Sequence, residues 1–474
     1  MSNAPLMLSV SGLRGLIGQS LTPPVAAKFG AAFGSWLAAL KRAGGNAAAP
    51  HVVLGRDSRP SGQMIECAAV SGLLAVGCRV TTLGIVTTPT TAIMTEHLAA
   101  DGGMVITASH NPIIWNGIKC LRHDGVAPPP EEANEIIRRF KSDDVQYVPV
   151  EALGKLAHDA AANRVHLDRV LPQVDVAAIR KAKLKCVVDS VCGAGGAAAA
   201  MLLRELGVEL VHLYSEPTGL FPHTPEPLRE NLTELAAAVK QHGAHVGFAQ
   251  DPDADRLALV DERGEYIGEE YTLALTVEHV LARDKARRHE GTRARSGTGA
   301  HCVAANLSTS RMLDDIAAKH GAIVHRTAVG EANVAAAMRK HGAIIGGEGN
   351  GGVILPPVTF VRDSITGMAL ILELLATRGQ PLGAIVSEIP RYAIVKDKVA
   401  FDAAVASRLV PVLKEKFASQ KIDLQDGVRI DWPDRWVHVR PSNTEPIMRL
   451  IAEAPRDEDA KAIIAQVRAA LGLK

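Results

Sequence analysis

Three carboxylates stand at alternate positions in one short segment of the 474-residue chain, Asp251-Pro252-Asp253-Ala254-Asp255-Arg256. Three like charges so close together repel one another, and a bound cation removes that repulsion by accepting their hard oxygen ligands. A calcium EF-hand is excluded because its sixth position, which requires glycine, holds Arg256, and because residues 257–260 predict a strand. An exposed acidic turn is the alternative, which the apolar segments on both sides disfavour. The segment therefore predicts an all-oxygen metal site of the kind that suits magnesium.

A second polar loop places a serine beside a histidine, in the run Thr107-Ala108-Ser109-His110-Asn111-Pro112. Adjacent residues seldom form a nucleophile–base pair, and the G-x-S-x-G turn of a hydrolase is absent from this run. A little further on, Asn116-Gly117 predicts a tight turn that places Lys119 beside the same loop. A lysine there can serve as an acid–base group or as a phosphate ligand, and an ordinary surface lysine is the alternative.

Two further loops have side chains suited to binding hydroxyl and phosphate groups. In the run 346–352, Glu348 and Asn350 stand among five glycines, so a ligand can approach the backbone closely and hydrogen-bond both side chains. This run does not match G-x-G-x-x-G before a helix, and a structural hairpin is the alternative. The second loop combines guanidinium, hydroxyl and amide donors as a phosphate clamp does, with a helix cap as the alternative. Its sequence, with Arg449 nearby, is Arg440-Pro441-Ser442-Asn443-Thr444-Glu445-Pro446.

The elements that must position these loops recur three times along the chain. A short apolar strand, a polar loop, a helix and a second strand begin at His51, at Cys186 and again at Cys302. Each unit continues with a helix, a glycine and another strand, and these later strands lead into the serine, aspartate and glycine loops. Such alternation predicts α/β domains with mainly parallel sheets, in which loops at the carboxyl ends of strands carry ligand sites. We therefore expect the three loops to occupy equivalent places in three similar domains.

The rest of the sequence limits the class of protein to which this chain can belong. Residues from about 390 onward predict a smaller α+β domain, and the polar segment 283–300 predicts a surface loop, with phosphate binding as a weaker alternative. Fifty-two Lys and Arg residues offset 51 Asp and Glu residues, which gives no sign of a nucleic-acid or membrane-surface partner. We expect no signal peptide and no membrane span, because no basic leader or sufficiently long apolar run is present. The six cysteines are scattered without metal-ligand spacing, and we expect a cytoplasmic protein.

Taken together, the four loops resemble, in order and over nearly the full chain, the signatures of the α-D-phosphohexomutase family, the phosphoglucomutase/phosphomannomutase superfamily. The resemblance implies three similar α/β domains with mixed sheets and a smaller α+β C-terminal domain around a central cleft. We place the domains at 1–155 (phosphoserine loop), 156–264 (metal loop), 265–388 (sugar loop) and 389–474 (phosphate-binding loop).

The resemblance also implies roles for single residues. Ser109 would be a phosphoserine, with Mg²⁺ between its phosphate and Asp251, Asp253 and Asp255. Lys119 matches the family's general base, Arg14 matches an arginine near the transferred phosphate, and His110 would assist. The substrate-binding residues would be Arg256, Glu331, Glu348, Asn350, Arg440, Ser442, Asn443, Thr444 and Arg449.

These roles imply an isomerase that moves phosphate between the 6- and 1-positions of a hexose phosphate through phosphoserine and a hexose 1,6-bisphosphate. Many phosphomannomutase relatives have Glu-x-Ser-Gly-His in the sugar loop and a histidine after Val-Gly, whereas this chain has Asn350, Gly352 and Glu331 at those places. These departures resemble phosphoglucosamine mutases of the archaeal type and favour glucosamine 6-phosphate as substrate. A phosphoglucomutase/phosphomannomutase is the alternative, and a sugar-phosphate phosphatase or bisphosphate-forming phosphotransferase is a more remote one. We expect a monomer or homodimer that binds only small molecules.

Overall fold

The structure, a computed structural model, describes residues 6–289, 301–442 and 447–473 and divides into two compact units. Unit 1 takes in Met1–Thr276 and Asn350–Ala384, and unit 2 takes in Val277–Gly349 and Ile385–Lys474. Helices α9 (Glu270–His289) and α13 (Leu382–Ser387) each contain a boundary between the units. No helix among the described residues is both long and apolar enough to span a membrane.

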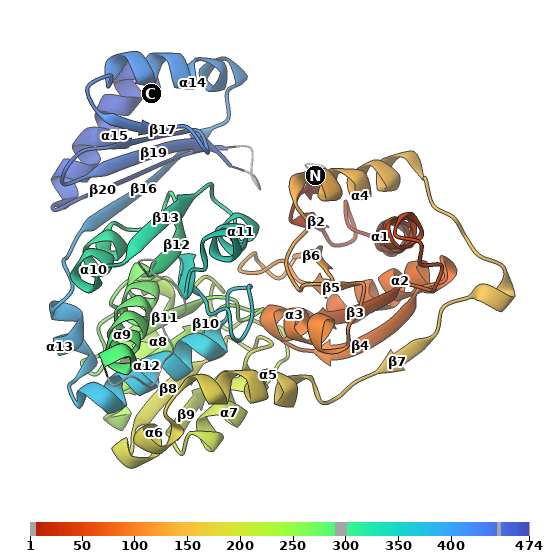
Figure 1. Cartoon of the computed structure of the whole chain (residues 1–474), viewed down its shortest axis with the longest axis horizontal. Coiled ribbons are helices and arrows are strands. Elements are labelled where there is room, and N and C mark those ends of the chain that lie inside the picture. Colours follow the sequence, from red (N-terminus) through yellow and green to blue (C-terminus); the bar gives the residue numbers. More distant parts are fainter. Residues whose placement is uncertain (1–5, 290–300, 443–446, 474) are drawn as a thin grey trace. The chain divides into compact units, whose positions relative to one another are not determined.

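Unit 1 begins with a mixed seven-stranded sheet in the order β1-β2-β6-β5-β3-β4-β7 (Figure 1). Its strands β5, β3, β4 and β7 run parallel, and β6, β2 and β1 extend the sheet in antiparallel pairs. The strands are β1 (Met7–Ser9), β2 (Gly12–Leu16), β3 (His51–Arg56), β4 (Arg79–Ile85), β5 (Gly102–Ile106), β6 (Trp115–Arg122) and β7 (Leu156–His158).

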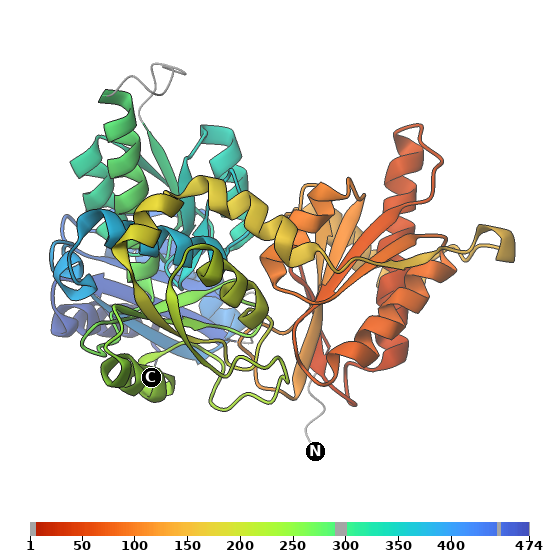
Figure 2. The ribbon, with the colours of Figure 1, turned by 90° about the horizontal axis from the view of Figure 1, so that it is seen from below.

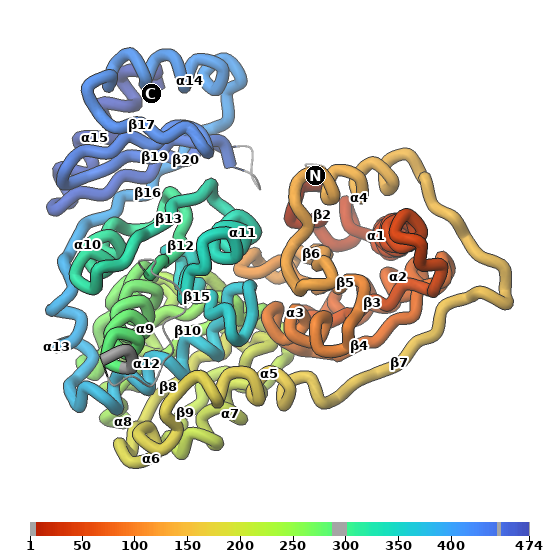
Figure 3. The backbone as a smooth tube through the Cα atoms, viewed as in Figure 1, coloured from red at the N-terminus to blue at the C-terminus, as the bar shows by residue number. Residues whose placement is uncertain are grey.

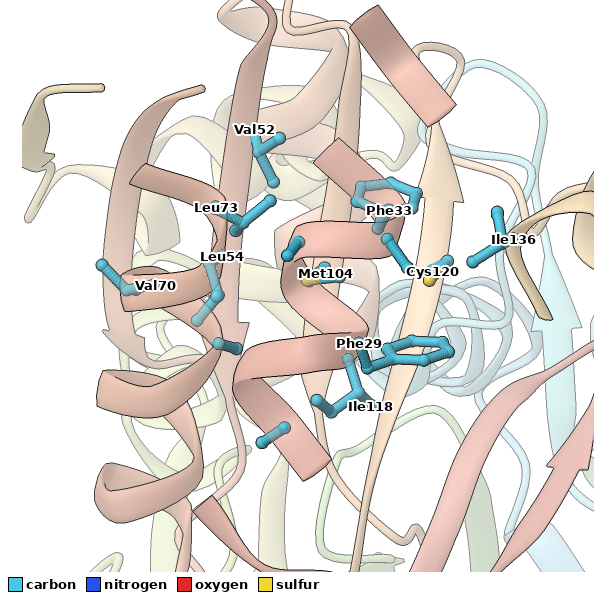
Figure 4. Close-up of a cluster of buried hydrophobic side chains, with 14 of the residues drawn as sticks. Phe29, Phe33, Val52, Leu54, Val70, Leu73, Met104, Ile118, Cys120 and Ile136 are labelled. Carbon is cyan, nitrogen blue, oxygen red and sulfur yellow. The ribbon is translucent and has the colours of Figure 1, made fainter. Parts of the chain in front are cut away.

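Helices cover both faces of this sheet (Figure 2). On one face, α1, α2 and α4 bury a large apolar cluster that includes Phe29, Phe33 and Met104 (Figure 4). Helices α1 and α2 lie unusually close together, since a Cβ at Gly30 or Gly72 would lie 2.5 or 2.0 Å from a carbonyl oxygen of the other helix. Helices α3 and α5 cover the other face. The helices are α1 (Pro23–Ala43), α2 (Gly62–Ala75), α3 (Thr88–His97), α4 (Pro130–Ser142) and α5 (Ala162–Val170).

Between α4 and β7 the backbone makes a long extended excursion that includes the short helix η1 (Val150–Ala152), as Figure 3 shows. After α5 and η2 (Leu171–Gln173), unit 1 continues with a second sheet in the order β11-β10-β8-β9. Its apolar core lies under α8, and α12 is buried along most of its length. These elements are α6 (Val176–Ala182), β8 (Lys185–Asp189), α7 (Gly196–Glu205), β9 (Glu209–Leu213), η3 (Arg229–Asn231), α8 (Thr233–His242), β10 (Val246–Gln250), β11 (Leu257–Asp261) and α12 (Ser364–Arg378). Unit 1 also contains β15 (Gly352–Ile354), which is not a strand of this sheet.

Unit 2 contains a parallel arrangement of β14, β12 and β13 and a separate five-stranded antiparallel sheet in the order β16-β20-β19-β18-β17. Helices α14 and α15 close the apolar core of the second sheet. The elements are β12 (Cys302–Asn306), α10 (Met312–His320), β13 (Ile323–Thr327), α11 (Glu331–His341), β14 (Ile345–Glu348), β16 (Ala393–Ala400), α14 (Ala403–Lys416), β17 (Lys421–Asp423), β18 (Val428–Asp431), β19 (Trp436–Pro441), β20 (Ile447–Ala454) and α15 (Asp457–Leu471).

The threefold repetition predicted from the sequence is confirmed. The parallel strands adopt one order in all three sheets, β5-β3-β4, β10-β8-β9 and β14-β12-β13. The serine, aspartate and glycine loops follow β5, β10 and β14, so they leave equivalent strands. The smaller C-terminal α+β domain is present as well.

Two local predictions were wrong. Asn116-Gly117 is not a turn but part of strand β6, which carries Lys119. Gly117 is needed there for close packing, because a Cβ would lie 2.6 Å from the carbonyl oxygen of Leu13 and 2.8 Å from that of Thr107. The expected surface loop 283–300 begins as helix, since α9 continues to His289, and residues 290–300 lie outside the described part of the chain.

Candidate active site

Ser109 lies in the loop that joins β5 to β6 and has a left-handed backbone, with φ of +51°. Such a conformation costs a residue other than glycine about 1–3 kcal/mol, so the surroundings must enforce it. The side chain is buried, and its Oγ donates a hydrogen bond to Oδ2 of Asp251 at 3.0 Å. The serine and aspartate loops, 142 residues apart in the sequence, therefore meet at one site in unit 1.

Arg59 binds the backbone of the serine loop. Its Nη2 donates to the carbonyl oxygens of Ser109 and Asn111, at 2.6 Å each, and its Nη1 pairs with the carboxylate of Asp57. The backbone N–H of Ser109 donates to Oγ1 of Thr107 at 2.9 Å, and that hydroxyl donates to Asp57 at 2.7 Å. Arg59, Asp57 and Thr107 are all buried. The network fixes the loop backbone and leaves the Ser109 hydroxyl pointing at the aspartates.

The three aspartates form a compact buried group. One carboxylate oxygen from each lies within 4.8 Å of the others, and Ala254 makes the turn between them with φ of +53°. Oδ1 of Asp253 and Oδ1 of Asp255 are buried without a hydrogen-bond donor among the described residues. Buried carboxylate oxygens without partners are costly, and a divalent cation with a preference for oxygen would satisfy both. The donor set therefore fits a hard metal ion.

Besides Ser109, the side chains of Lys119, Arg362 and Thr88 contact this group closely. Lys119 Nζ lies 2.7 Å from Oδ2 of Asp253 and 3.5 Å from Oδ2 of Asp255. Arg362 donates from Nη2 to Oδ2 of Asp255 at 2.6 Å, and Thr88 donates from Oγ1 to Oδ2 of Asp253, also at 2.6 Å. Lys119 is thus not the surface lysine that its sequence context allowed, but a largely buried partner of the aspartates.

These contacts shift the pKa values of Asp251 and Asp253 in opposite directions. Burial raises the pKa of Asp251 well above its ordinary value, and the charges of Asp255 and Asp253 raise it further. Burial acts in the same direction on Asp253, but the Lys119 ammonium outweighs it and holds the pKa of Asp253 below its ordinary value. Burial alone would lower the pKa of Lys119, yet the two nearby aspartates raise it. Lys119 is therefore held in its protonated form beside an ionised Asp253.

Three more of the predicted residues surround Ser109. His110 Nδ1 lies 3.4 Å from Ser109 Oγ, and burial together with the positive charges of Arg256 and Arg14 lowers the pKa of His110 well below its ordinary value. Arg256 follows the aspartates directly, and its backbone N–H donates to Oδ1 of Asp251 at 3.1 Å. Arg14 lies on β2 opposite Gly117. Burial lowers the pKa of Arg14, although the charges of Asp253 and Asp255 act against that shift.

Glu348 ends strand β14 in unit 2 and is buried. Its Oε1 accepts hydrogen bonds from Nδ2 of Asn306 at 2.7 Å and from the backbone N–H of Gly330 at 3.1 Å. Glu331 follows Gly330 and begins helix α11. The hydrogen bond from Gly330 therefore brings Glu348 close to the start of helix α11, where Glu331 lies.

The C-terminal loop places Arg440 and Arg449 directly opposite one another on the antiparallel strands β19 and β20. Like charges in opposed positions destabilise a sheet unless an anion lies between or beside them. Burial lowers the pKa of Arg440; the charge of Asp426 opposes this shift and that of Arg449 adds to it. Ser442 follows Pro441 at the end of β19, whereas Asn443 and Thr444 lie outside the described residues.

Asn350 belongs by its contacts to unit 1. Its Oδ1 accepts a hydrogen bond from Nη1 of Arg362 at 3.3 Å, and the same guanidinium binds Asp255. Among the described residues of unit 1, the sequence prediction missed Arg59, Thr88 and Arg362. None of these lies in one of the four signature loops, and no pattern in the sequence marks an isolated arginine or threonine as a partner of an aspartate far along the chain.

Family models for phosphoglucomutase/phosphomannomutase match the chain in four successive parts. Alpha/beta/alpha domains I, II and III match residues 7–146, 164–264 and 270–392, and the C-terminal domain matches residues 394–470.

Whole proteins match as well. A protein of Thermococcus kodakarensis named phosphoglucomutase/phosphomannomutase is 39% identical over 454 residues, which cover 95% of each chain. A probable phosphoglucosamine mutase of Methanopyrus kandleri is 36% identical and covers 95% of this chain and 94% of its own. The crystal structure of a phosphoglucomutase/phosphomannomutase family protein from Burkholderia thailandensis superposes with a TM-score of 0.81 at 28% identity, over 98% of both chains.

Proposed function

Because this chain belongs to the phosphoglucomutase/phosphomannomutase family, we propose that it is a phosphohexomutase that moves a phosphoryl group between the 6- and 1-positions of a hexose phosphate. One observation carries the proposal for this chain's own site: the Ser109 hydroxyl lies 3.0 Å from Asp251 within a buried group of three aspartates. A phosphorylated serine there would pass its phosphoryl group to the sugar and take the other one back from a hexose 1,6-bisphosphate.

Each residue of the site has a distinct task in this proposal. Asp251, Asp253 and Asp255 would hold Mg²⁺, which would neutralise charge that develops on the transferred phosphoryl group. Arg14 provides positive charge beside the same group. Such positioning and charge neutralisation supply most of the catalysis in phosphoryl transfer, because the reaction needs little covalent help from the protein.

Lys119 is the proton carrier in this proposal. The raised pKa of Lys119 favours its ammonium form, which can donate a proton to the sugar oxygen when the phosphoryl group returns to Ser109. In the opposite direction the neutral amine that this donation leaves on Lys119 takes up the proton of the attacking sugar hydroxyl. His110, whose pKa is lowered by burial and by neighbouring positive charges, remains neutral and assists as a hydrogen-bond partner of Ser109.

The far end of the substrate would be held by the opposed arginines. Arg440 and Arg449, with Ser442, Asn443 and Thr444, provide the donors for the phosphate that is not being transferred. Glu348 and Asn350 would bind sugar hydroxyls, and Arg256 would contact the substrate near the aspartates. After the first transfer, the bisphosphate must turn end for end so that its other phosphate faces Ser109.

We propose glucosamine 6-phosphate as the preferred substrate and glucosamine 1-phosphate as its product. The loops Gly-Glu-Gly-Asn-Gly-Gly and Val-Gly-Glu support this choice, as does the name of the Methanopyrus kandleri relative. Glu331 would interact with the ammonium group of the hexosamine. The name of the Thermococcus kodakarensis relative favours the second candidate, a phosphoglucomutase/phosphomannomutase. In either case we propose a cytoplasmic enzyme that acts as a monomer or homodimer.

A substrate comparison tests the proposal. Turnover of glucosamine 6-phosphate, glucose 6-phosphate and mannose 6-phosphate is measured with Mg²⁺ and a catalytic amount of hexose 1,6-bisphosphate. We expect the highest kcat/KM for the glucosamine compound, and we expect Glu331→Gln to lower that value while sparing the two uncharged sugars. A preference for mannose or glucose would establish the second candidate. Release of free phosphate without isomer would instead show a phosphatase.

A further inference from the structure

A buried chain of hydrogen bonds runs through unit 1 behind the candidate active site. His166 of α5 is fully buried, and both of its ring nitrogens are engaged. Nδ1 lies 2.9 Å from Oγ1 of Thr90, and Nε2 lies 2.9 Å from Oδ2 of Asp363. Thr90 in turn lies 2.6 Å from the hydroxyl of Thr87. None of these side chains has a task in the phosphoryl transfer described above.

Every contact in this series can pair a donor with an acceptor. Nε2–H of His166 donates to the Asp363 carboxylate, and the Thr90 hydroxyl links Nδ1 of His166 to the Thr87 hydroxyl. Asp363 also accepts the backbone N–H groups of Ile365 and Thr366 at 2.9 and 3.1 Å. Burial would raise the pKa of Asp363, but His166 and the other donors outweigh it, so the carboxylate stays ionised.

The residues at both ends of this hydrogen-bonded series, Thr87 and Asp363, are helix caps. Thr87 caps α3 by accepting the N–H of Thr90, and Asp363 caps α12 through the two N–H groups just named. Helix α5, which carries His166, contacts both α3 and α12 (Figure 1). His166 thus ties the beginnings of two helices together through their capping residues.

The residues next to these caps hold the aspartate loop. Thr88 follows the α3 cap and binds Asp253 twice, through N–H to the carbonyl oxygen at 3.0 Å and through Oγ1 to Oδ2 at 2.6 Å. Arg362 precedes the α12 cap and binds Asp255, and the N–H of Ser364 donates to the carbonyl oxygen of Ala254 at 3.3 Å. A shift between the two helix starts would therefore displace Asp253 relative to Asp255.

We propose that His166 is a positioning residue for the aspartate loop. The bonds from His166 to Thr90 and Asp363 set the spacing between the helix starts, and thereby the spacing of the carboxylates that receive the metal ion. This inference rests on the proposed function for its effect on turnover, but its effect on loop order and metal binding is independent of which reaction the site performs.

The test replaces His166 with a ring that has no hydrogen-bonding groups. His166→Phe keeps most of the volume and removes both bonds, whereas His166→Gln keeps an amide donor toward Asp363. Arg169→Met is the matched control, because Arg169 also lies on α5 and ties it to α3 through an ion pair with Glu96 but does not reach the aspartates. Each full-length variant is compared by Mn²⁺ binding in electron paramagnetic resonance, deuterium exchange of residues 246–261, and kcat and KM.

For His166→Phe we expect Mn²⁺ binding to weaken by about 10-fold or more, the size usual for loss of a group that orients metal ligands. Exchange should rise in residues 246–261, and kcat should fall while KM stays within about twofold, the measure of a positioning loss. His166→Gln should recover part of each effect. Arg169→Met should lower the melting temperature without changing Mn²⁺ binding.

Unchanged Mn²⁺ binding and loop exchange in a folded His166→Phe protein would overturn the inference, as would equal losses in Arg169→Met. Should His166→Phe fail to fold, Thr90→Val decides the question, because it removes one hydroxyl of the chain at nearly constant shape and should weaken Mn²⁺ binding in the same direction. A wild-type protein that binds Mn²⁺ but turns over none of the three sugar phosphates would refute the proposed function alone.

Discussion

Arg59 offers a sharp test of how the left-handed conformation of Ser109 is maintained. Arg59→Lys keeps a positive charge beside Asp57 but cannot reproduce the planar group that donates from one nitrogen to the carbonyl oxygens of Ser109 and Asn111. Hydrogen bonds from a charged donor contribute about 1.5 kcal/mol or more each. The variant should therefore lose about 1.5 kcal/mol if the ammonium keeps one carbonyl and about 3 kcal/mol if it keeps neither.

That energy should appear in the phosphoryl-transfer step. Since each 1.36 kcal/mol corresponds to a tenfold change in rate, kcat should fall by roughly 10- to 160-fold. KM should change little, because Arg59 lies beneath the serine loop and donates to its backbone rather than to substrate. The rate at which Ser109 gains phosphate from glucose 1,6-bisphosphate, followed by intact mass, should fall by the same factor as kcat.

Arg56→Lys is the matched control. Arg56 lies three residues away and pairs with Glu66 at 2.8 Å, but it makes no bond to the serine loop. It should lose some stability and keep its phosphorylation rate. Equal losses in the two variants, or an Arg59→Lys protein with kcat within twofold of the wild type, would refute the reasoning.

Three further outcomes are expected. Burial lowers the pKa of His438 to about 4. Between about pH 6.5 and 4 the unfolded chain therefore binds a proton at this residue that the folded chain does not. The free energy of unfolding should fall by about 3 kcal/mol over that range and then level off. His438→Gln should flatten that part of the denaturant-unfolding profile, and an unchanged slope would contradict the assignment. Mg²⁺ at about 100 times its Kd should stabilise the protein by about 2.7 kcal/mol in thermal unfolding, and an Asp251→Asn protein that keeps this gain would exclude a metal site at Asp251. Arg440→Met should raise KM for every sugar phosphate by roughly 10-fold or more, as loss of a charge-assisted phosphate contact predicts, and a change confined to kcat would argue against phosphate binding there.

Much of the architecture could be predicted because it depends on local patterns. Alternating apolar strands and helices, separated by glycines, specify α/β units, and the chain repeats that pattern from His51, Cys186 and Cys302. The loops with unusual side chains also follow equivalent strands, as the repetition predicted. The contact between Ser109 and Asp251 then follows from two such loops belonging to one compact unit.

The wrong prediction at Asn116-Gly117 came from residue types that serve more than one purpose. Asn-Gly is a strong turn signal, but Gly117 is small because it lies against two carbonyl oxygens in the interior of a sheet. Packing between distant segments decided that position, and it cannot be inferred from neighbours in the sequence. The same holds for His166, since the pattern of helix α5 does not reveal that its imidazole meets Thr90 and Asp363.

The charges around the aspartates explain why the supporting residues matter as much as the signature loops. Lys119 and Arg362 contact Asp253 and Asp255 closely, so these two cations offset two of the three negative charges when all three carboxylates are ionised, while Arg256 lies farther away, with Nε 4.0 Å from Oδ1 of Asp255. A phosphate on the nearby serine adds about 1.5 to 2 negative charges. The site then again has about as much excess negative charge as the two cations had offset. The site therefore needs a divalent cation most when the serine carries phosphate. In that same state the phosphoserine must be protected from hydrolysis. The signature loops supply the reacting groups, and two cations outside those loops, Lys119 and Arg362, determine how strongly the aspartates need the metal.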